Sequence, residues 1–486
     1  MTLRPYLIGT VLGLISCARF AASSEPDGKV GVFEQRMRAG GTGGPALFRK
    51  LPSRSGRTFA VSPRGRDIND CTERAPCREI QRAIALATAP GDTVLVADGE
   101  YRGFVADGMR GTASLPITIF ATGRGAVVQP EASCEKKACR DTIVIRNSRH
   151  FIIDGLSSRQ APRAAVAILY GDHVTVRHGR FHDNRRWGIF TSFADDVVIE
   201  RNEISASHRE HGIYLSNSGD RPTVRANLIY DNDGSGIHVN GDFRERPEMD
   251  RSGRSFYSGQ VDGIISGASI EGNLIFRNGS GKIAKKRRRG GSGINLDGVW
   301  DSVVKDNVLF DNSGAGIAAF GDADGVIDDS PDDGDGRFGP QGLTITNNTV
   351  VMPELARNAL QLRLSHGPNV VSNNILLHAD SRRVGLEFVT ALDAFRVTSN
   401  ANVLERVSVG DRVRSLEVWR RESGQDKQSL AIPIARLFVD PANGDYSVVS
   451  ASPAKRLNAS PIQGPDIAAQ TAREQRPCSV GACPFF

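Results

Sequence analysis

The chain between residues 187 and 242 carries a repeating pattern of apolar and polar positions. Three segments, WGIFTSF, HGIYLSN and SGIHVNG, each place Gly-Ile near the start of an alternating run. Polar turns and further alternating runs separate them. A period of two residues is typical of β-strands, whereas helices show a period of 3.6. A repeat this short cannot bury its own apolar face, so it must stack on copies of itself.

Two positions of the repeat recur along the rest of the chain. The expected inward-facing residues are Ile189, Ile213, Ile237, Ile294, Ile317, Leu360 and Leu386. The expected turn residues are Asn202, Asn227, Asn273, Asn307, Asn348, Asn374 and Asn400. Because Asn tolerates left-handed turns and its amide can bond to the next coil, the Asn series predicts a structural ladder. The pattern predicts an all-β fold, a single-stranded right-handed parallel β-helix.

Residues 1–22 have the character of an export signal. Arg4 precedes the apolar run YLIGTVLGLI, which is too short to span a bilayer as a stable helix. Small residues at 21–23 suit ordinary cleavage; the alternative is a lipoprotein signal ending at Cys17, with a lipid anchor there. We expect a linker over 23–57, the β-helix over 58–405 and a C-terminal capping or tail region over 406–486. No later segment is expected to span a membrane.

A short helix is predicted before the first coil. Ile80, Ala83, Ile84 and Ala87 fall on one helical face, and Pro90-Gly91 follows. The terminal coil of a solenoid exposes its core and its unpaired backbone, so it needs a cap. We therefore expect this helix to cover the N-terminal end of the stack.

The cysteines favour an oxidising compartment. Apart from Cys17 there are six, in three close pairs: Cys71 with Cys77, Cys134 with Cys139, and Cys478 with Cys483. Such local pairs predict disulfides. A zinc site is the alternative, but no Cys-x-x-Cys spacing supports it. We expect a monomeric protein that is secreted or otherwise extracytoplasmic, in the periplasm or at the cell surface.

Several longer segments resemble a known group of proteins. These segments are GDTVLVADGEY, LPITIFA, HGIYLSNSGDRPTVRANLIYDNDGSGIHVNGD and, near the C-terminus, LFVDPANGDYSVVSASPA. They resemble bacterial secreted right-handed β-helix repeat proteins of the pectate-lyase-like superfamily. The resemblance runs from about Thr58 to Phe486 and implies the fold and export. The superfamily contains lyases, hydrolases, epimerases and binding proteins, so the activity must be argued from a site.

Strand alternation predicts one chemically rich outer face. If the Ile positions point inward, their neighbours point outward in two rows. The first row is Phe190, Tyr214, His238, Asn295, Ala318, Gln361 and Glu387, and the second is Ser192, Ser216, Asn240, Asp297, Phe320 and Arg363. Trp187 and His211 precede the Gly on the same side. Aromatic rings and short polar groups along a solenoid suit an extended polysaccharide. The alternative is structural: His238 caps a turn and Tyr214 shields the sheet.

Insertions near this face add charge. The run Lys285–Arg289 holds five consecutive cations, which attract a polyanion or form a solvated loop. The segment 321–339 holds seven Asp residues, either a calcium site or a solvated acidic loop. The formal net charge of +6 is modest for 486 residues, so nucleic-acid binding is not expected.

These positions give a candidate site for cleavage of an acidic, uronate-type polysaccharide. A lyase needs a base and a cation that neutralises the substrate carboxylate. The candidate catalytic residues are His211, Tyr214, His238 and Arg363. The candidate substrate-binding residues are Trp187, Phe190, Asn240, Asn295, Lys285, Lys286 and Arg287. Asp242 and Asp297 are candidate ligands for calcium, or the carboxyl pair of a glycosidase. The alternatives are a non-catalytic glycan-binding protein and a structural cell-envelope protein.

Overall fold

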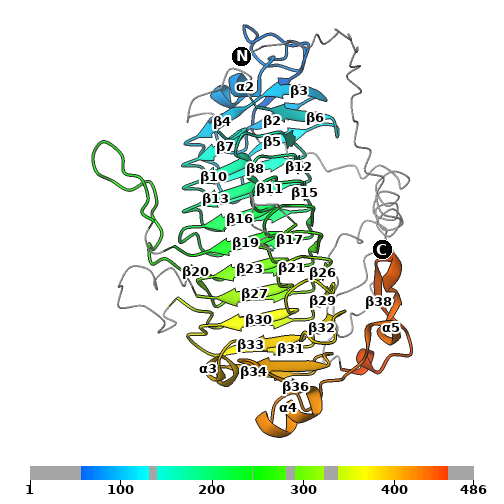
Figure 1. The fold of residues 1–486 in the computed structure, drawn as a ribbon. Coiled ribbons are helices and arrows are strands. Elements are labelled where there is room, and N and C mark those ends of the chain that lie inside the picture. Colours follow the sequence, from blue (N-terminus) through cyan, green and yellow to red (C-terminus); the bar gives the residue numbers. More distant parts are fainter. Residues whose placement is uncertain (1–55, 131–139, 243–244, 281–289, 322–337, 458–486) are drawn as a thin grey trace, which may run out of the picture.

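The computed structural model describes residues 56–130, 140–242, 245–280, 290–321 and 338–457. Most strands belong to three long sheets whose strands stack along one axis (Figure 1). All pairs within the three sheets are parallel except β35 with β36. In the regular part of the stack each coil contributes one strand to each sheet, so the molecule is a parallel β-helix, as predicted.

Sheet A contains β1 (Thr58–Val61), β2 (Thr93–Val96), β5 (Ile117–Ala121), β8 (Arg149–Asp154), β11 (Asp172–Arg177), β14 (Val198–Glu200), β17 (Thr223–Arg225), β21 (Ser269–Glu271), β25 (Val303–Lys305), β28 (Thr344–Thr346), β31 (Asn369–Ser372) and β34 (Val397–Asn400). Sheet B contains β3 (Gly99–Arg102), β6 (Ala126–Gln129), β9 (Ser157–Arg159), β12 (Arg180–His182), β15 (Glu203–Ser205), β18 (Leu228–Tyr230), β22 (Leu274–Phe276), β26 (Val308–Phe310), β29 (Thr349–Met352) and β32 (Ile375–His378). Sheet C contains β4 (Phe104–Asp107), β7 (Ile143–Arg146), β10 (Ala164–Leu169), β13 (Trp187–Ser192), β16 (Ile213–Ser216), β19 (Ile237–Asn240), β23 (Ile294–Asp297), β27 (Ile317–Phe320), β30 (Leu360–Arg363), β33 (Leu386–Phe388), β35 (Arg406–Val409) and β36 (Arg412–Ser415).

The remaining elements lie at the ends and edges of the stack. They are α2 (Ile80–Leu86), β20 (Ile265–Ser266), β24 (Val299–Trp300), α3 (Ala391–Phe395), α4 (Leu416–Ser423), α5 (Ile434–Leu437), β37 (Phe438–Asp440), η3 (Pro441–Asn443), β38 (Asp445–Val448) and η4 (Pro453–Arg456).

The core is a column of aliphatic side chains inside the coils. All seven predicted inward residues, from Ile189 to Leu386, are fully buried in one continuous apolar cluster. They also pair with one another in register, for example Ile189 with Ile213 and Ile213 with Ile237. Each coil is too thin to exclude water from its own interior, so burial depends on the coils above and below.

An asparagine ladder runs along the turn between sheets A and B. From Asn227 onward, each amide oxygen accepts the backbone N–H of the Asn one coil earlier, as from Asn202 to Asn227 at 3.0 Å. The ladder contains Asn202, Asn227, Asn273, Asn307, Asn348, Asn374 and Asn402. The prediction of Asn400 as its last member was wrong: that residue lies on β34 and donates to Gln428 Oε1 at 3.1 Å. The step from Asn374 to Asn402 is 28 residues, two more than the step before it, so the regular spacing misplaces the turn.

Both ends of the stack are covered. Helix α2 buries Ile80, Ala83 and Ile84 against the first coil, as predicted for a capping helix. At the other end, α4 buries Leu416 and Trp419, and the Trp419 ring lies 5.7 Å from that of Phe388. The residues after α4 pack on the outer surface of sheet B, in a second apolar cluster that includes Leu437 and Phe438.

One predicted disulfide falls among the described residues. Cys71 and Cys77 are bonded, with their Cα atoms 4.6 Å apart, and both are fully buried. The other two predicted pairs, Cys134 with Cys139 and Cys478 with Cys483, lie outside the described residues, as do Cys17 and the predicted signal. None of the helices in the described ranges is long and apolar enough to cross a membrane.

Candidate functional site

The candidate site lies on the outer surface of sheet C, where strand register sets both predicted rows. Phe190, Tyr214, His238 and Asn295 follow one another on β13, β16, β19 and β23. In the second row, Ser216 pairs with Asn240 and Asn240 with Asp297. These four strands stack in order through the middle of the molecule (Figure 1).

The N-terminal part of this face is an aromatic cluster. The rings of Trp187 and Phe190 stack with centroids 4.5 Å apart, and the Tyr214 ring lies 5.3 and 5.6 Å from them. The guanidinium of Arg163 lies over both Trp187 and Phe190, and Arg163 is paired with Asp141. Rings that stack on sugars must be exposed, but Trp187 and Phe190 are only 6% and 8% exposed, because they cover each other and Arg163 covers both. Of these three rings, only Tyr214 remains half-buried.

A histidine pair adjoins this cluster. His211 precedes β16 and His238 lies on β19, and their rings meet edge to face with centroids 4.4 Å apart. The facing nitrogens, His211 Nε2 and His238 Nδ1, are 3.0 Å apart. On its other side, His211 Nδ1 accepts the backbone N–H of Ser235 at 2.9 Å. The structure therefore brings together two residues 27 positions apart in the sequence.

Burial keeps both imidazoles neutral. Removal from water lowers the pKa of His211 well below its usual value, and the neighbouring His238 lowers it further. Burial lowers the pKa of His238 to about 4, with the Asn240 side chain acting in the opposite direction. At neutral pH the pair is uncharged.

Tyr214 is a phenol surrounded by acids. Burial raises the pKa of its hydroxyl, and the negative charges of Asp242, Glu210 and Asp297 raise it further. Asn240 Nδ2 donates to the Tyr214 hydroxyl oxygen at 3.3 Å. The two predicted metal ligands, Asp242 and Asp297, therefore both act on this hydroxyl, which remains protonated at neutral pH.

The structure separates Arg363 from the other candidate catalytic residues. Phe320 lies between Asp297 and Arg363 in the second row, so Arg363 is two coils beyond Asp297. Its strand is three coils beyond that of His238, about 14 Å at the usual strand spacing of about 4.8 Å. Its side chain is exposed. Lys285, Lys286 and Arg287 lie outside the described residues.

An arm formed by residues 245–263 lies along one edge of the face; sequence periodicity could not place it. Figure 1 shows this arm as the green loop at the left of the stack. Glu248 pairs with Arg146 at 3.2 Å, and its backbone N–H donates to the Tyr170 hydroxyl at 3.0 Å. Tyr257 donates to Asp195 Oδ1 at 2.8 Å. The arm thus contacts earlier coils of the stack, and its longest-range contact, from Glu248 to Arg146, joins residues 102 positions apart.

A second polar cluster lies where the coils pass from sheet C to sheet A. The cluster contains Asp172, His173 and Asp196. One carboxylate oxygen of each aspartate and one ring nitrogen of His173, all atoms that could bind a metal ion, lie within 4.8 Å of one another. His173 Nδ1 is 2.6 Å from Asp172 Oδ1, whereas Asp196 already binds Arg221 through both oxygens. The apolar periodicity does not indicate this cluster as a candidate cation site. The signal that could have found it is histidine and aspartate recurring at one turn position of successive coils.

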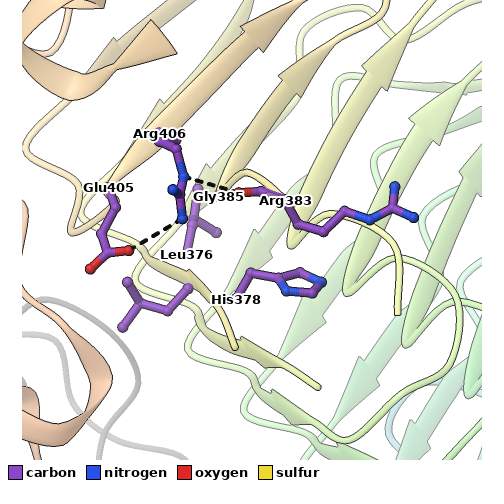
Figure 2. A pocket seen from close by; sticks show the side chains of 7 residues that line it. Leu376, His378, Arg383, Gly385, Glu405 and Arg406 are labelled. Atoms are coloured by element: carbon purple, nitrogen blue, oxygen red, sulfur yellow. Dashed lines mark hydrogen bonds and ion pairs between the residues drawn. The ribbon is translucent and has the colours of Figure 1, made fainter. Parts of the chain in front are cut away.

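A small pocket lies elsewhere, beside the end of β32. It is lined by Leu376, Leu377, His378, Arg383, Gly385, Glu405 and Arg406. Figure 2 shows Arg406 directed to the Arg383 carbonyl, at 3.2 Å, and to Glu405, at 3.7 Å. The pocket has a volume of about 10 Å³, which suits a single water molecule. The candidate site is therefore an extended surface of sheet C, separate from this pocket.

Comparisons with known proteins agree with this architecture. A family model described as "Right handed beta helix region" matches residues 132–252. An uncharacterized protein of Bacillus subtilis (strain 168), YwoF, is 25% identical over 463 residues, which cover 82% of this chain and 92% of YwoF.

The solved structure of a pectate lyase shows the same fold. Pectate lyase Pel9A superimposes with a TM-score of 0.56 at 15% identity, covering 88% of this chain and 96% of the lyase. A rhamnogalacturonan lyase has a TM-score of 0.46 at 13% identity, covering 71% of this chain and 87% of that protein. The chain is a right-handed parallel β-helix protein with a pectate-lyase-like fold.

Proposed function

We propose that this protein is extracytoplasmic and acts on a polysaccharide along the outer surface of sheet C. The observation that carries the proposal is the continuous row from Tyr214 through His238 to Asn295, with Asn240 and Asp297 beside it. A row spaced by one strand per coil matches a ligand that is itself a repeating polymer. The pectate-lyase fold supports the same class of ligand by analogy.

The finer proposal is lyase-type cleavage of an acidic, uronate polymer. In this chemistry Asp242 and Asp297 hold a cation such as Ca²⁺, which neutralises the substrate carboxylate. Both carboxylates belong to the surroundings of Tyr214, and hard oxygen donors are the ligands that calcium prefers. Arg363 and the Lys285–Arg289 run would guide the rest of an anionic chain toward this face.

The second candidate is glycan binding without cleavage. Tyr214 is held as a phenol, and both histidines have bonds to their Nδ1 atoms that restrict their use as bases. A lyase requires a proton acceptor within reach of the substrate. The protonation of the described candidates therefore favours recognition over proton abstraction.

The deciding experiment exposes the purified chain to a panel of uronate and neutral polysaccharides. Binding is followed by calorimetry, and cleavage by the absorbance of unsaturated products and by new reducing ends. Cleavage that is lost with EDTA and in Asp297→Asn supports the lyase. Binding without products supports the glycan-binding protein. If no polysaccharide binds, the proposed function is wrong.

A further inference from the structure

We infer that His211 and His238 form a tautomer-locked pair that presents His238 Nε2–H as a hydrogen-bond donor to a hydroxyl group of the bound sugar. Asn295, its register neighbour on β23, supplies the matching acceptor through Oδ1. The inference rests on the proposed polysaccharide ligand and specifies the group of that ligand, a sugar hydroxyl, that the site recognises. His211 acts here as a positioning residue, because it acts through His238.

The proton positions follow from the hydrogen-bond chain. The Ser235 N–H points at His211 Nδ1, so that nitrogen has no proton. A neutral imidazole carries one N–H, so the proton of His211 is on Nε2. It faces His238 Nδ1 at 3.0 Å, so this second nitrogen must also accept. The remaining proton of His238 is therefore on Nε2.

Protonation of either ring would break this chain. An additional proton on His211 Nδ1 would meet the Ser235 N–H, and one on His238 Nδ1 would meet the His211 Nε2–H. Two donors would then face each other at hydrogen-bond distance. Burial also disfavours protonation, since it lowers the pKa of both rings.

Two polar atoms at the end of this series of hydrogen bonds have unmet hydrogen-bonding capacity. By distance and angle, His238 Nε2 and Asn295 Oδ1 are both buried atoms without a hydrogen-bond partner among the described parts of the chain. The Asn240 side chain is near enough to raise the pKa of His238, but it makes no hydrogen bond to Nε2 by these criteria. The two residues are register neighbours on β19 and β23. Buried polar atoms of this kind are costly unless a ligand or water satisfies them.

A hydroxyl group fits this pair better than a carboxylate. A hydroxyl accepts from His238 and donates to Asn295 in the same position, whereas a carboxylate only accepts. The pair also lies beside Tyr214, which is under the influence of Asp242, Glu210 and Asp297. Unless a bound cation neutralises them, these carboxylates repel a second anion. The sugar seated here therefore turns a hydroxyl edge toward His238, and any uronate carboxylate points away from His238 and Asn295.

Nitrogen-15 NMR of the full chain at pH 7 tests the lock without any ligand. We expect both histidines to be Nε2–H tautomers. In His211→Phe, which lacks the ring nitrogens, His238 should become a mixture of tautomers. A His238 that is Nδ1–H or doubly protonated in the native chain would overturn the inference.

Calorimetry with two probes tests the ligand class. The probes are an oligogalacturonate and its carboxyl-reduced, neutral counterpart. We expect His238→Phe to weaken binding of both by roughly 2- to 13-fold, the usual effect of losing one hydrogen bond. His182→Phe, on sheet B, is the matched control and should leave both affinities unchanged.

The possible failures are distinguishable. If the native chain binds and His238→Phe binds equally well, the inference is wrong and the proposed function stands. If neither probe binds the native chain, the assigned ligand class is wrong together with the proposed function, and the NMR result still decides the lock.

Discussion

At the scale of single residues, buried polar groups determine how this fold responds to pH. Asp306 is only 4% exposed, adopts a left-handed turn with φ 57°, and precedes Asn307 of the ladder. Burial raises the pKa of its carboxyl to about 7; Lys305 opposes this shift and Glu271 adds to it. Asn347 occupies the corresponding turn of the next coil with φ 56°, so an amide is compatible with this backbone.

We predict that Asp306→Asn stabilises the protein at pH 8 but not at pH 4. The folded carboxyl is protonated up to about pH 7, whereas the unfolded carboxyl loses its proton near pH 4. Stability contributed by this group is therefore greatest below pH 4 and falls as the pH rises toward 7. Thermal unfolding at the two pH values measures the difference, which we expect to be on the order of 2 kcal/mol.

Asp301→Asn is the control for this substitution. Asp301 also has a left-handed backbone, with φ 46°, but its side chain is exposed. The melting temperature of the Asp301→Asn variant should differ little from that of the native protein at either pH. An equal gain in both variants would show that the turn conformation, and not the buried charge, is responsible.

At the scale of elements, the asparagine ladder connects successive coils through their turns. Asn402 accepts from the Asn374 N–H, and its amide donates to the Val371 carbonyl at 3.0 Å. We predict that Asn402→Ala costs about 2–4 kcal/mol, because it leaves buried backbone groups unsatisfied. Asn400→Ala should cost about 1 kcal/mol or less, since its hydrogen bonds are exposed. Denaturant unfolding compares the two, and equal costs would contradict the ladder assignment.

The C-terminal cap should protect its neighbouring coils selectively. Trp419 is 4% exposed, contacts Phe388, and donates from Nε1 to Asp426 at 2.9 Å. Because each coil of a solenoid contacts mainly its neighbours, loss of the cap should loosen the last coils first. We predict that Trp419→Ala increases hydrogen exchange in β33 and β35 and leaves β13 and β16 protected. Val413→Ala, at an exposed position, is the control. Uniform loss of protection would instead indicate a fully cooperative stack.

At the scale of the whole molecule, periodicity predicted the stack because each coil repeats the same alternation of inward apolar and outward polar side chains. Ile189 and Ile213 face inward for one reason, strand alternation, and their register then brings Tyr214 next to His238. What periodicity could not provide was geometry between coils. The direction of the protons in the histidine pair depends on the Ser235 N–H, and the burial of Trp187 depends on Arg163.

The placement of inserted segments relative to the stack escaped prediction for a related reason. The bond from Tyr257 to Asp195 joins residues 62 positions apart, and the arm that carries Tyr257 has no repeat to set its register. The distance from His238 to Arg363 was equally inaccessible, because it depends on the number of intervening coils. A site that spans several coils is therefore harder to predict than the stack that supports it.

Charge acts over the largest distances, so the final prediction concerns ionic strength. The five cations of Lys285–Arg289 lie, in sequence, between β22 and the strand of Asn295 and Asp297. Replacing all five by Gln should weaken binding of an oligogalacturonate most at low salt, because ions already screen the attraction at high salt. Calorimetry at about 20 mM and about 300 mM salt, where the screening length falls several-fold, measures the effect. The carboxyl-reduced oligosaccharide is the matched control and should bind equally well to both chains. If the variant loses affinity equally for charged and neutral probes, the cations support the structure of the face and do not attract the anionic polymer.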